Sequence, residues 1–286
     1  MGPRSTGPGP GPWILAAWSP PWRLPRPWQA PVPALKKRFG QHFLRDPFVL
    51  ARIAQACAQA PGEHTIEIGP GDGALTAHLL ERLDTLHVVE IDRDLIAALK
   101  QRFAGNRVVV HEADALRLDL CGLVSGRLRV VGNLPYNISS PLIFRFLDEP
   151  CIAGMVFLLQ KEVVDRLAAP PGGRDYGRLS VMVQARCEVT PLFTVASGAF
   201  VPPPAVESRL VALQPRPSQI PSTDTALFGA IVARAFSQRR KMLRQSLRGY
   251  FQDEDWRALA IDPTRRPETL TVTEFAALAA HARGQA

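Results

Sequence analysis

Apolar positions follow two different periods between residues 47 and 213, and this alternation predicts a mixed α/β domain. Short apolar runs rich in β-branched residues, bounded by Gly, Pro or charged residues, predict strands. These runs are residues 65–68, 86–91, 107–111, 128–132, 154–160 and 208–213. Apolar residues spaced three and four apart predict helices between the runs. These segments are residues 47–60, 74–83, 93–103, 141–147 and 161–167. Strands that alternate with helices in this way are typical of a largely parallel sheet covered by helices.

Residues 178–185 and 188–195 are apolar but fit either a helix or a strand. The pattern changes after residue 213, where residues 214–223 indicate a Pro-rich linker. The remaining patterns are all helical, at residues 225–236, 239–250, 254–260 and 273–282. We therefore predict one α/β domain at 35–213 and a linker with a small helical domain at 214–286.

Residues 1–34 differ from the rest of the chain because they are dense in Pro and Gly and hold four of its five Trp. Such a composition predicts a disordered extension, and a targeting peptide is the alternative. No apolar run approaches the ~20 residues of a membrane helix. No coiled-coil pattern is visible, so a monomer is expected.

Charge is the feature of the composition that narrows the function. The 286 residues carry 34 Lys and Arg against 26 Asp and Glu, a net charge of +8. Two acid-free windows, before Asp46 and at residues 225–252, concentrate the basic residues. Each window fits either a surface for a polyanion such as RNA or an ordinary solvated face.

Four cysteines, Cys57, Cys121, Cys151 and Cys187, are far apart in the sequence and form no C-x-x-C motif. This spacing argues against a zinc site and against a disulfide framework. We expect reduced core residues in a reducing compartment.

Ligand-binding chemistry gathers where the predicted strands end. Gly69 and Gly71 follow the first strand, and glycine allows positive φ angles and close approach to a ligand. The spacing G-x-G-x-G differs from the G-x-G-x-x-G of dinucleotide binders, and a plain turn is the alternative. Glu90 ends the second strand, where a carboxylate can accept ribose hydroxyls or lie exposed. Asp114 follows the third strand, where it can accept from an adenine amino group or cap a helix.

The fourth strand is followed directly by Asn133, Leu134, Pro135 and Tyr136. The Asn133 amide oxygen and the Leu134 carbonyl can accept the two N–H groups of a flat amine, and the Tyr136 ring can stack on its base. Two acceptors draw the nitrogen lone pair out of ring conjugation, so that it can attack a methyl group. A Pro-Tyr turn that merely ends a strand is the alternative for this tetrapeptide alone. Taken together, the four strand ends predict an S-adenosylmethionine cleft with the target amine at its mouth.

With these motifs, the chain resembles the ribosomal RNA adenine N6,N6-dimethyltransferases, in their bacterial small-subunit form, over residues 35–284. Residues 37–44, Lys-Arg-Phe-Gly-Gln-His-Phe-Leu, resemble the opening motif of the family. Residues 200–208 resemble its F-x-P-x-P-x-V-x-S motif, and residues 235–247 resemble its C-terminal domain. The resemblance implies a Rossmann-like class I methyltransferase fold, with a seven-stranded, mostly parallel sheet and a small all-helical C-terminal domain.

The resemblance also implies roles for individual residues. The cofactor would be bound by Gln41, His42, Leu44, Gly69, Gly71, Glu90, Asp114 and Asn133. Where His42 stands the family usually has Asn, so a backbone contact is expected there. The catalytic set would be Asn133, Leu134, Pro135, Tyr136 and Phe200, with Tyr136 and Phe200 on the two faces of the flipped adenine. Phe200 could alternatively be a core aromatic at a strand edge. No metal is expected.

RNA would be held by basic residues in the two acid-free windows, namely Lys36, Lys37, Arg38, Arg240, Lys241, Arg244 and Arg248. Arg240, Arg244 and Arg248 recur four apart, which predicts one face of a helix. Leu134 replaces the first Pro of the related D/N-P-P-Y motif, which predicts a roomier pocket that admits a monomethylated amine.

The implied activity is transfer of methyl groups from S-adenosylmethionine to two adjacent adenines in the 3′-terminal hairpin of small-subunit rRNA. The partner would be the immature small subunit and the location the cytoplasm. The alternatives keep the fold but change the target, to large-subunit rRNA, DNA or a protein Gln amide, or lose catalysis and leave an RNA-binding assembly factor.

Overall fold

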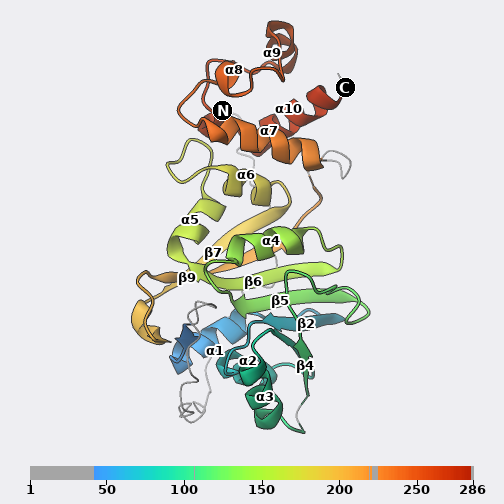
Figure 1. The fold of residues 1–286 in the computed structure, drawn as a ribbon, viewed down its shortest axis with the longest axis vertical. Coiled ribbons are helices and arrows are strands. Elements are labelled where there is room, and N and C mark those ends of the chain that lie inside the picture. The colour runs from blue at the N-terminus through green and yellow to red at the C-terminus, as the bar shows by residue number, and fades with distance from the viewer. Residues whose placement is uncertain (1–41, 106, 219, 221–224, 285–286) are drawn as a thin grey trace, which may run out of the picture.

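The computed structural model describes residues 42–284 except 106, 219 and 221–224 (Figure 1). The predicted extension at 1–34 and the predicted site residues Lys36, Lys37, Arg38 and Gln41 lie outside the described residues. A seven-stranded sheet occupies the middle of the molecule, in the order β4-β3-β2-β5-β6-β9-β7. Its strands are β2 (Glu63–Ile68), β3 (Leu86–Glu90), β4 (Val108–Glu112), β5 (Arg127–Asn133), β6 (Ile152–Gln160), β7 (Cys187–Val195) and β9 (Ser208–Pro215).

The sheet is parallel from β4 to β6 and antiparallel where β9 joins β6 and β7. The chain runs outward from β2 through β3 to β4 and then returns to the other side of β2 as β5. Ligands bind at such a reversal, beyond the carboxyl ends of the strands. The ends of β2 and β5 therefore mark the expected cleft, and the predicted seven-stranded, mostly parallel sheet is confirmed.

Helices cover both faces of the sheet. They are α1 (Pro47–Ala56), α2 (Ala74–Leu80), α3 (Arg93–Arg102), α4 (Ser139–Leu147), α5 (Lys161–Ala168) and α6 (Arg178–Gln184). On one face, residues of α4 and α5 such as Phe146 and Val164 pack with Ile66 and Val130 of the sheet. On the other face, residues of α1 and α2 such as Leu50 pack with Val131. The ambiguous apolar segments resolve as α6 and β7.

Two short strands that the hydrophobic pattern did not predict lie beside the main sheet. β1 (Phe43–Leu44) pairs antiparallel with β8 (Phe200–Val201). The backbone N–H groups of Arg45 and Asp46 both donate to the Ala199 carbonyl, at 2.8 and 3.3 Å. These bonds fix the segment before α1 against a loop that is distant in the sequence.

The C-terminal helices stack at one end of the molecule, beyond α6 (Figure 1). They are α7 (Thr225–Ser237), α8 (Leu243–Ser246), α9 (Asp253–Leu259) and α10 (Val272–Arg283). Phe228, Leu247 and Phe275 belong to their hydrophobic core, which also includes Val181 of α6. The boundary at residue 213 stays a prediction.

The helix predicted at 239–250 is wrong, because only α8 forms there. The backbone N–H groups of Leu243 and Arg244 donate to the carbonyls of Arg265 and Pro263, so the residues before α8 cannot continue a helix into it. Gly249 then adopts a left-handed φ of 92°, beyond the end of α8. Arg240, Arg244 and Arg248 consequently do not share one helix face, although all three are exposed.

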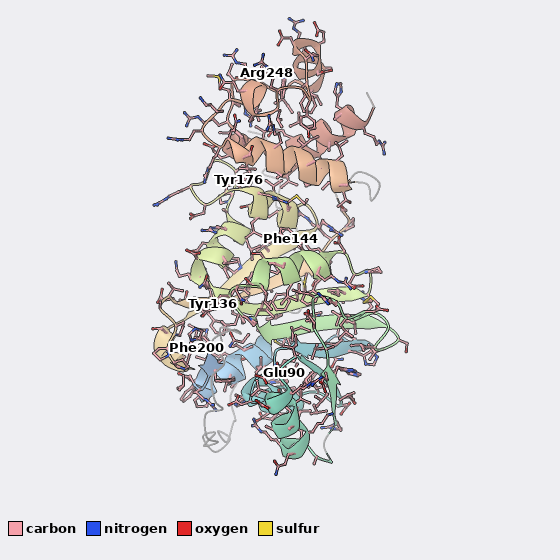
Figure 2. The ribbon with its side chains drawn as sticks, in the orientation of Figure 1. Glu90, Tyr136, Phe144, Tyr176, Phe200 and Arg248 are labelled. Carbon is pink, nitrogen blue, oxygen red and sulfur yellow. A yellow bond between two sulfur atoms is a disulfide. The ribbon has the colours of Figure 1, made fainter. Side chains whose placement is uncertain are left out.

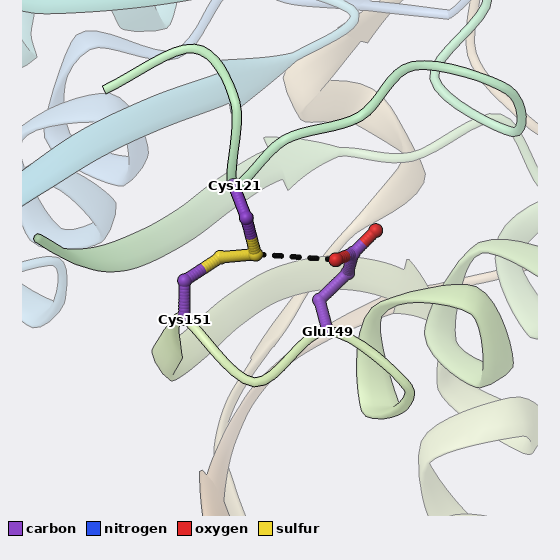
Figure 3. A group of neighbouring side chains, drawn as sticks. All are labelled: Cys121, Glu149 and Cys151. Atoms are coloured by element: carbon purple, nitrogen blue, oxygen red, sulfur yellow. Dashed lines mark hydrogen bonds between the residues drawn. A yellow bond between two sulfur atoms is a disulfide. The ribbon is translucent and has the colours of Figure 1, made fainter. Parts of the chain in front are cut away.

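The expectation that all four cysteines are reduced is also wrong. Cys121 and Cys151 form a disulfide, with Glu149 beside it at 3.1 Å from the Cys121 Sγ (Figure 3). The fold places the two Cα atoms 5.7 Å apart, which their sequence spacing could not reveal. Cys57 and Cys187 are free and buried, as expected. Within the described part of the chain, no helix is long and apolar enough to cross a membrane.

Candidate active site

A cavity of about 320 Å³ lies at the carboxyl ends of β2, β3 and β5, within the range that small-molecule sites occupy. Its lining includes His42, Leu44, Gly69, Gly71, Glu90, Asp114, Asn133, Leu134, Pro135 and Tyr136. These are all the described residues that the sequence assigned to the cofactor and the amine, with one exception. Phe200 does not line the cavity.

The glycine loop forms the floor where β2 gives way to α2. Gly69 and Gly71 have φ angles of 65° and 60°, which side chains other than hydrogen rarely permit. A Cβ on Gly71 would also stand 3.0 Å from the Phe43 ring. Glycine is thus required both by the backbone conformation and by the contact with β1, and the loop brings bare backbone to the cavity.

Glu90 presents a carboxylate that backbone amides orient. Its Oε1 accepts N–H groups from Ile91 and Asp92, each at 2.9 Å, and its Oε2 lies 3.4 Å from the Gly71 nitrogen. Burial raises the pKa of Glu90, and the backbone hydrogen bonds oppose that rise. A fixed carboxylate with one lightly engaged oxygen fits the predicted acceptor for ribose hydroxyls.

Asp114 also combines two tasks. Its Oδ1 accepts the N–H of Leu116 at 3.0 Å and so stabilises a turn, rather than the helix that was considered. Asp114 nevertheless lines the cavity beyond β4. Contact with an adenine amino group remains a prediction for this residue.

Glu67 is a cavity residue that the sequence did not single out. Its side chain is 1% exposed, and the Thr76 hydroxyl donates to it at 2.6 Å. Burial, together with the nearby carboxylates of Asp72 and Glu90, raises the pKa of Glu67 to about 8, although the Thr76 hydrogen bond opposes that rise. An acid between two isoleucines, two residues before Gly69, was the available signal.

Asn133 and Tyr136 are both oriented by hydrogen bonds. The Asn133 Nδ2 donates to the His42 carbonyl at 3.0 Å, which leaves the amide oxygen on the other side of the group. The Tyr136 hydroxyl lies 2.7 Å from the Ser208 Oγ. The His42 ring stacks on Tyr136 with centroids 5.8 Å apart, and its Nδ1 lies 2.9 Å from the Pro202 carbonyl oxygen. The His42 ring therefore contacts Tyr136 and Pro202, and the expected backbone contact of His42 with the cofactor stays a prediction.

Phe200 lies in the hydrophobic core in this structure, and its contact with the target adenine stays a prediction. It is 1% exposed and lies in the core that α1, α2 and the sheet share, opposite Leu44 in the β1–β8 pair. The alternative prediction, a core aromatic at a strand edge, therefore matches its position. Phe200 enters this core from β8, which pairs with β1.

The predicted RNA-binding residues that the structure describes are far from the cavity. We call Arg240, Lys241, Arg244 and Arg248 the basic cluster; all four are exposed around α8. Figure 2 shows Arg248 among the C-terminal helices, at the opposite end of the molecule from Glu90. RNA that reaches both would have to span the molecule.

The sheet order, the glycine loop and the acidic strand ends define the class of this protein: it is a Rossmann-like methyltransferase whose methyl donor is S-adenosylmethionine. A family model for ribosomal RNA adenine dimethylases matches residues 33–282. The chain therefore belongs to the ribosomal RNA adenine dimethylase family, whose members are enzymes.

Relatives of known name agree with this assignment. The chain is 51% identical to ribosomal RNA small subunit methyltransferase A of Aromatoleum aromaticum, over 85% of this chain and 92% of the relative. It is 51% identical to the protein of the same name from Pseudomonas aeruginosa, over 85% and 93%. Among solved structures it is similar to a dimethyladenosine transferase from Plasmodium falciparum, with 26% identity, a TM-score of 0.70 and coverage of 83% and 96%. It is also similar to the 23S rRNA methyltransferase ErmE, with 25% identity, a TM-score of 0.68 and coverage of 84% and 99%.

Proposed function

We propose that this chain dimethylates two adjacent adenines in the 3′-terminal hairpin of small-subunit rRNA, on an immature subunit in the cytoplasm. The Asn133 side chain carries this proposal. Because its Nδ2 is held by the His42 carbonyl, its oxygen is left to accept an N–H from an amine in the cavity. The second acceptor would be the Leu134 carbonyl; Leu134 lines the cavity, and its side chain is 1% exposed and belongs to the core.

The adenine must leave its stack to reach this position, which costs a few kcal/mol and least in a loop. The face of Tyr136 offers a stacking surface that repays part of this cost. Two acceptors fix the amino group, and alignment of the reacting atoms supplies much of the rate acceleration.

S-adenosylmethionine, when bound, supplies an electrophilic methyl group. The Gly69–Gly71 backbone and the Glu90 carboxylate are the groups that would hold the cofactor. As an amide, Asn133 takes no proton, so it orients the amine without acting as a base. The proton leaves the nitrogen after attack, when the nitrogen is cationic and acidic. A second transfer needs space around the monomethylated amine, and Leu134, in place of the first Pro of the related motif, would leave that space.

The choice of the small-subunit RNA as target follows from the degree of similarity. Relatives named for the small subunit are 51% identical over 85% of the chain, whereas the 23S rRNA enzyme is 25% identical. An assembly factor without catalysis is the other candidate. The retention of Glu90 and Asn133 in the cavity favours a working enzyme over that reading.

The proposal is tested by transfer of tritium from labelled S-adenosylmethionine to purified small subunits that lack the modification, with purified large subunits as the matched substrate control. We expect label on small subunits only, and none with Asn133→Ala. Label on large subunits would redirect the proposal to their rRNA. Tight binding to small subunits without transfer would favour the assembly factor.

A further inference from the structure

The hydroxyl of Tyr136 contacts β9, although the proposed function uses only the face of its ring. It lies 2.7 Å from the Ser208 Oγ, and Ser208 is fully buried. The backbone of Ser208 is paired on both sides, with Gln160 of β6 and Val195 of β7. The hydroxyl of this serine is therefore attached to backbone that neighbouring strands hold on both sides.

Tyr136 itself stands on less regular backbone. It follows the end of β5 in a turn that precedes α4, where the Ile138 N–H donates to the Pro135 carbonyl at 3.2 Å. A tyrosine ring on such a turn can adopt several rotamers. Fixing it in one of them when a base stacks costs conformational entropy. The hydroxyl contact and the His42 ring remove that freedom before a base arrives.

We propose that Ser208 is a positioning residue for methyl transfer, whose hydroxyl holds that of Tyr136 so that the ring offers its face to the target adenine. This inference rests on the proposed function. It also argues against Tyr136 as the proton acceptor, because its hydroxyl is engaged by the Ser208 hydroxyl. Burial raises the pKa of Tyr136, which keeps the phenol neutral.

Kinetics of a double-mutant cycle test the inference. Tyr136→Phe and Ser208→Ala each remove one end of the contact, and each should lower kcat on small subunits about three- to tenfold, as expected for one net hydrogen bond. The KM for S-adenosylmethionine should not change. The double variant should be no slower than the slower single variant, since both changes break the same contact.

Ser180→Ala is the matched control, because Ser180 is also a fully buried serine with a hydrogen bond, to the Arg166 carbonyl at 2.5 Å, but lies in α6. It should leave kcat unchanged. Additive losses in the double variant, or a wild-type kcat for Ser208→Ala, would overturn the positioning role.

A second measurement does not depend on activity and so separates this inference from the proposed function. The chain has three tyrosines, so a sample labelled with ¹³C at tyrosine Cζ gives three resonances, and Tyr136→Phe identifies one of them. That resonance should move in Ser208→Ala and stay in place in Ser180→Ala. If it does not move, the contact is absent and the inference fails even when methyl transfer is observed. If the wild type transfers no methyl group, the proposed function and the catalytic role of Ser208 fail together, whatever the spectrum shows.

Discussion

Glu67 should make the stability of this protein depend on pH in a direction opposite to that of most carboxylates. In the folded protein the pKa of Glu67 is raised from 4.5 to about 8, first by burial and then by neighbouring carboxylates. The folded state therefore keeps the proton up to about pH 8, whereas the unfolded chain releases it above pH 4.5. Stability from this group is fully present below pH 4.5 and is lost as the pH rises through 8.

The size of the effect follows from the width of that window. One pKa unit corresponds to about 1.4 kcal/mol, so a shift from 4.5 to about 8 corresponds to about 5 kcal/mol. No discount for solvent applies, because the side chain is 1% exposed. A loss of this size is comparable to the whole stability of many domains, about 5–15 kcal/mol.

Glu67→Gln removes the titration and keeps the shape. Its amide oxygen can still accept from the Thr76 hydroxyl, which donates at 2.6 Å in the wild type. Urea unfolding from pH 4.5 to 8.5 should show the variant gaining stability over the wild type by about 1.4 kcal/mol per pH unit up to about pH 8, where the gain levels off. Titrating groups that do not interact with Glu67 cancel in this difference.

Glu254→Gln is the control, because it makes the same chemical change at an exposed position in α9. Its difference from the wild type should stay flat across the same pH range. A flat difference for Glu67→Gln as well would refute a buried, protonated carboxyl in the cavity.

Three other predictions concern the cofactor, the disulfide and the RNA. Glu90→Ala should weaken S-adenosylmethionine binding at least tenfold in calorimetry, since hydrogen bonds to a charged group are worth about 1.5–3 kcal/mol; an affinity equal to that of Glu254→Ala would contradict the ribose contact. Reduction of the Cys121–Cys151 disulfide, whose partners are 30 residues apart, should lower the free energy of unfolding in urea by about 3.7 kcal/mol through loop entropy. A Cys121→Ser/Cys151→Ser variant should not respond to the reductant, and an unchanged wild-type unfolding midpoint would count against the disulfide. Replacing the basic cluster with Ala should weaken rRNA binding and reduce its salt slope by about 0.9 for each duplex phosphate that the variant no longer neutralises, with cofactor affinity unchanged; an unaltered slope would mean that these side chains are only solvated.

The part of the site that the sequence predicted shares one physical origin. Strand ends are the shared feature of Gly69, Glu90, Asp114 and Asn133: two are the last residue of a strand and two come just after one. The carboxyl ends of parallel strands meet at one edge of a sheet. Local pattern alone therefore sufficed to bring them to one cavity. The apolar runs likewise predicted the strands of the seven-stranded sheet, apart from β7, which stayed ambiguous.

The rest depends on contacts between distant segments, which local patterns do not contain. Phe200 turns into the core because β8 pairs with β1, and strands of two residues have no visible period. The helix predicted at 239–250 is interrupted because Leu243 is hydrogen-bonded to Arg265. The raised pKa of Glu67 results from its burial, whereas a glutamate in a sequence is normally expected to be exposed.

The most direct test of the account is to locate the methyl groups by mass spectrometry of rRNA from unmodified small subunits after incubation with the protein and S-adenosylmethionine. The account predicts two methyl groups on each of two adjacent adenines in the 3′-terminal hairpin, and none when Asn133 is replaced by Ala. Methyl groups on another RNA or another base, or undiminished transfer by Asn133→Ala, would contradict it.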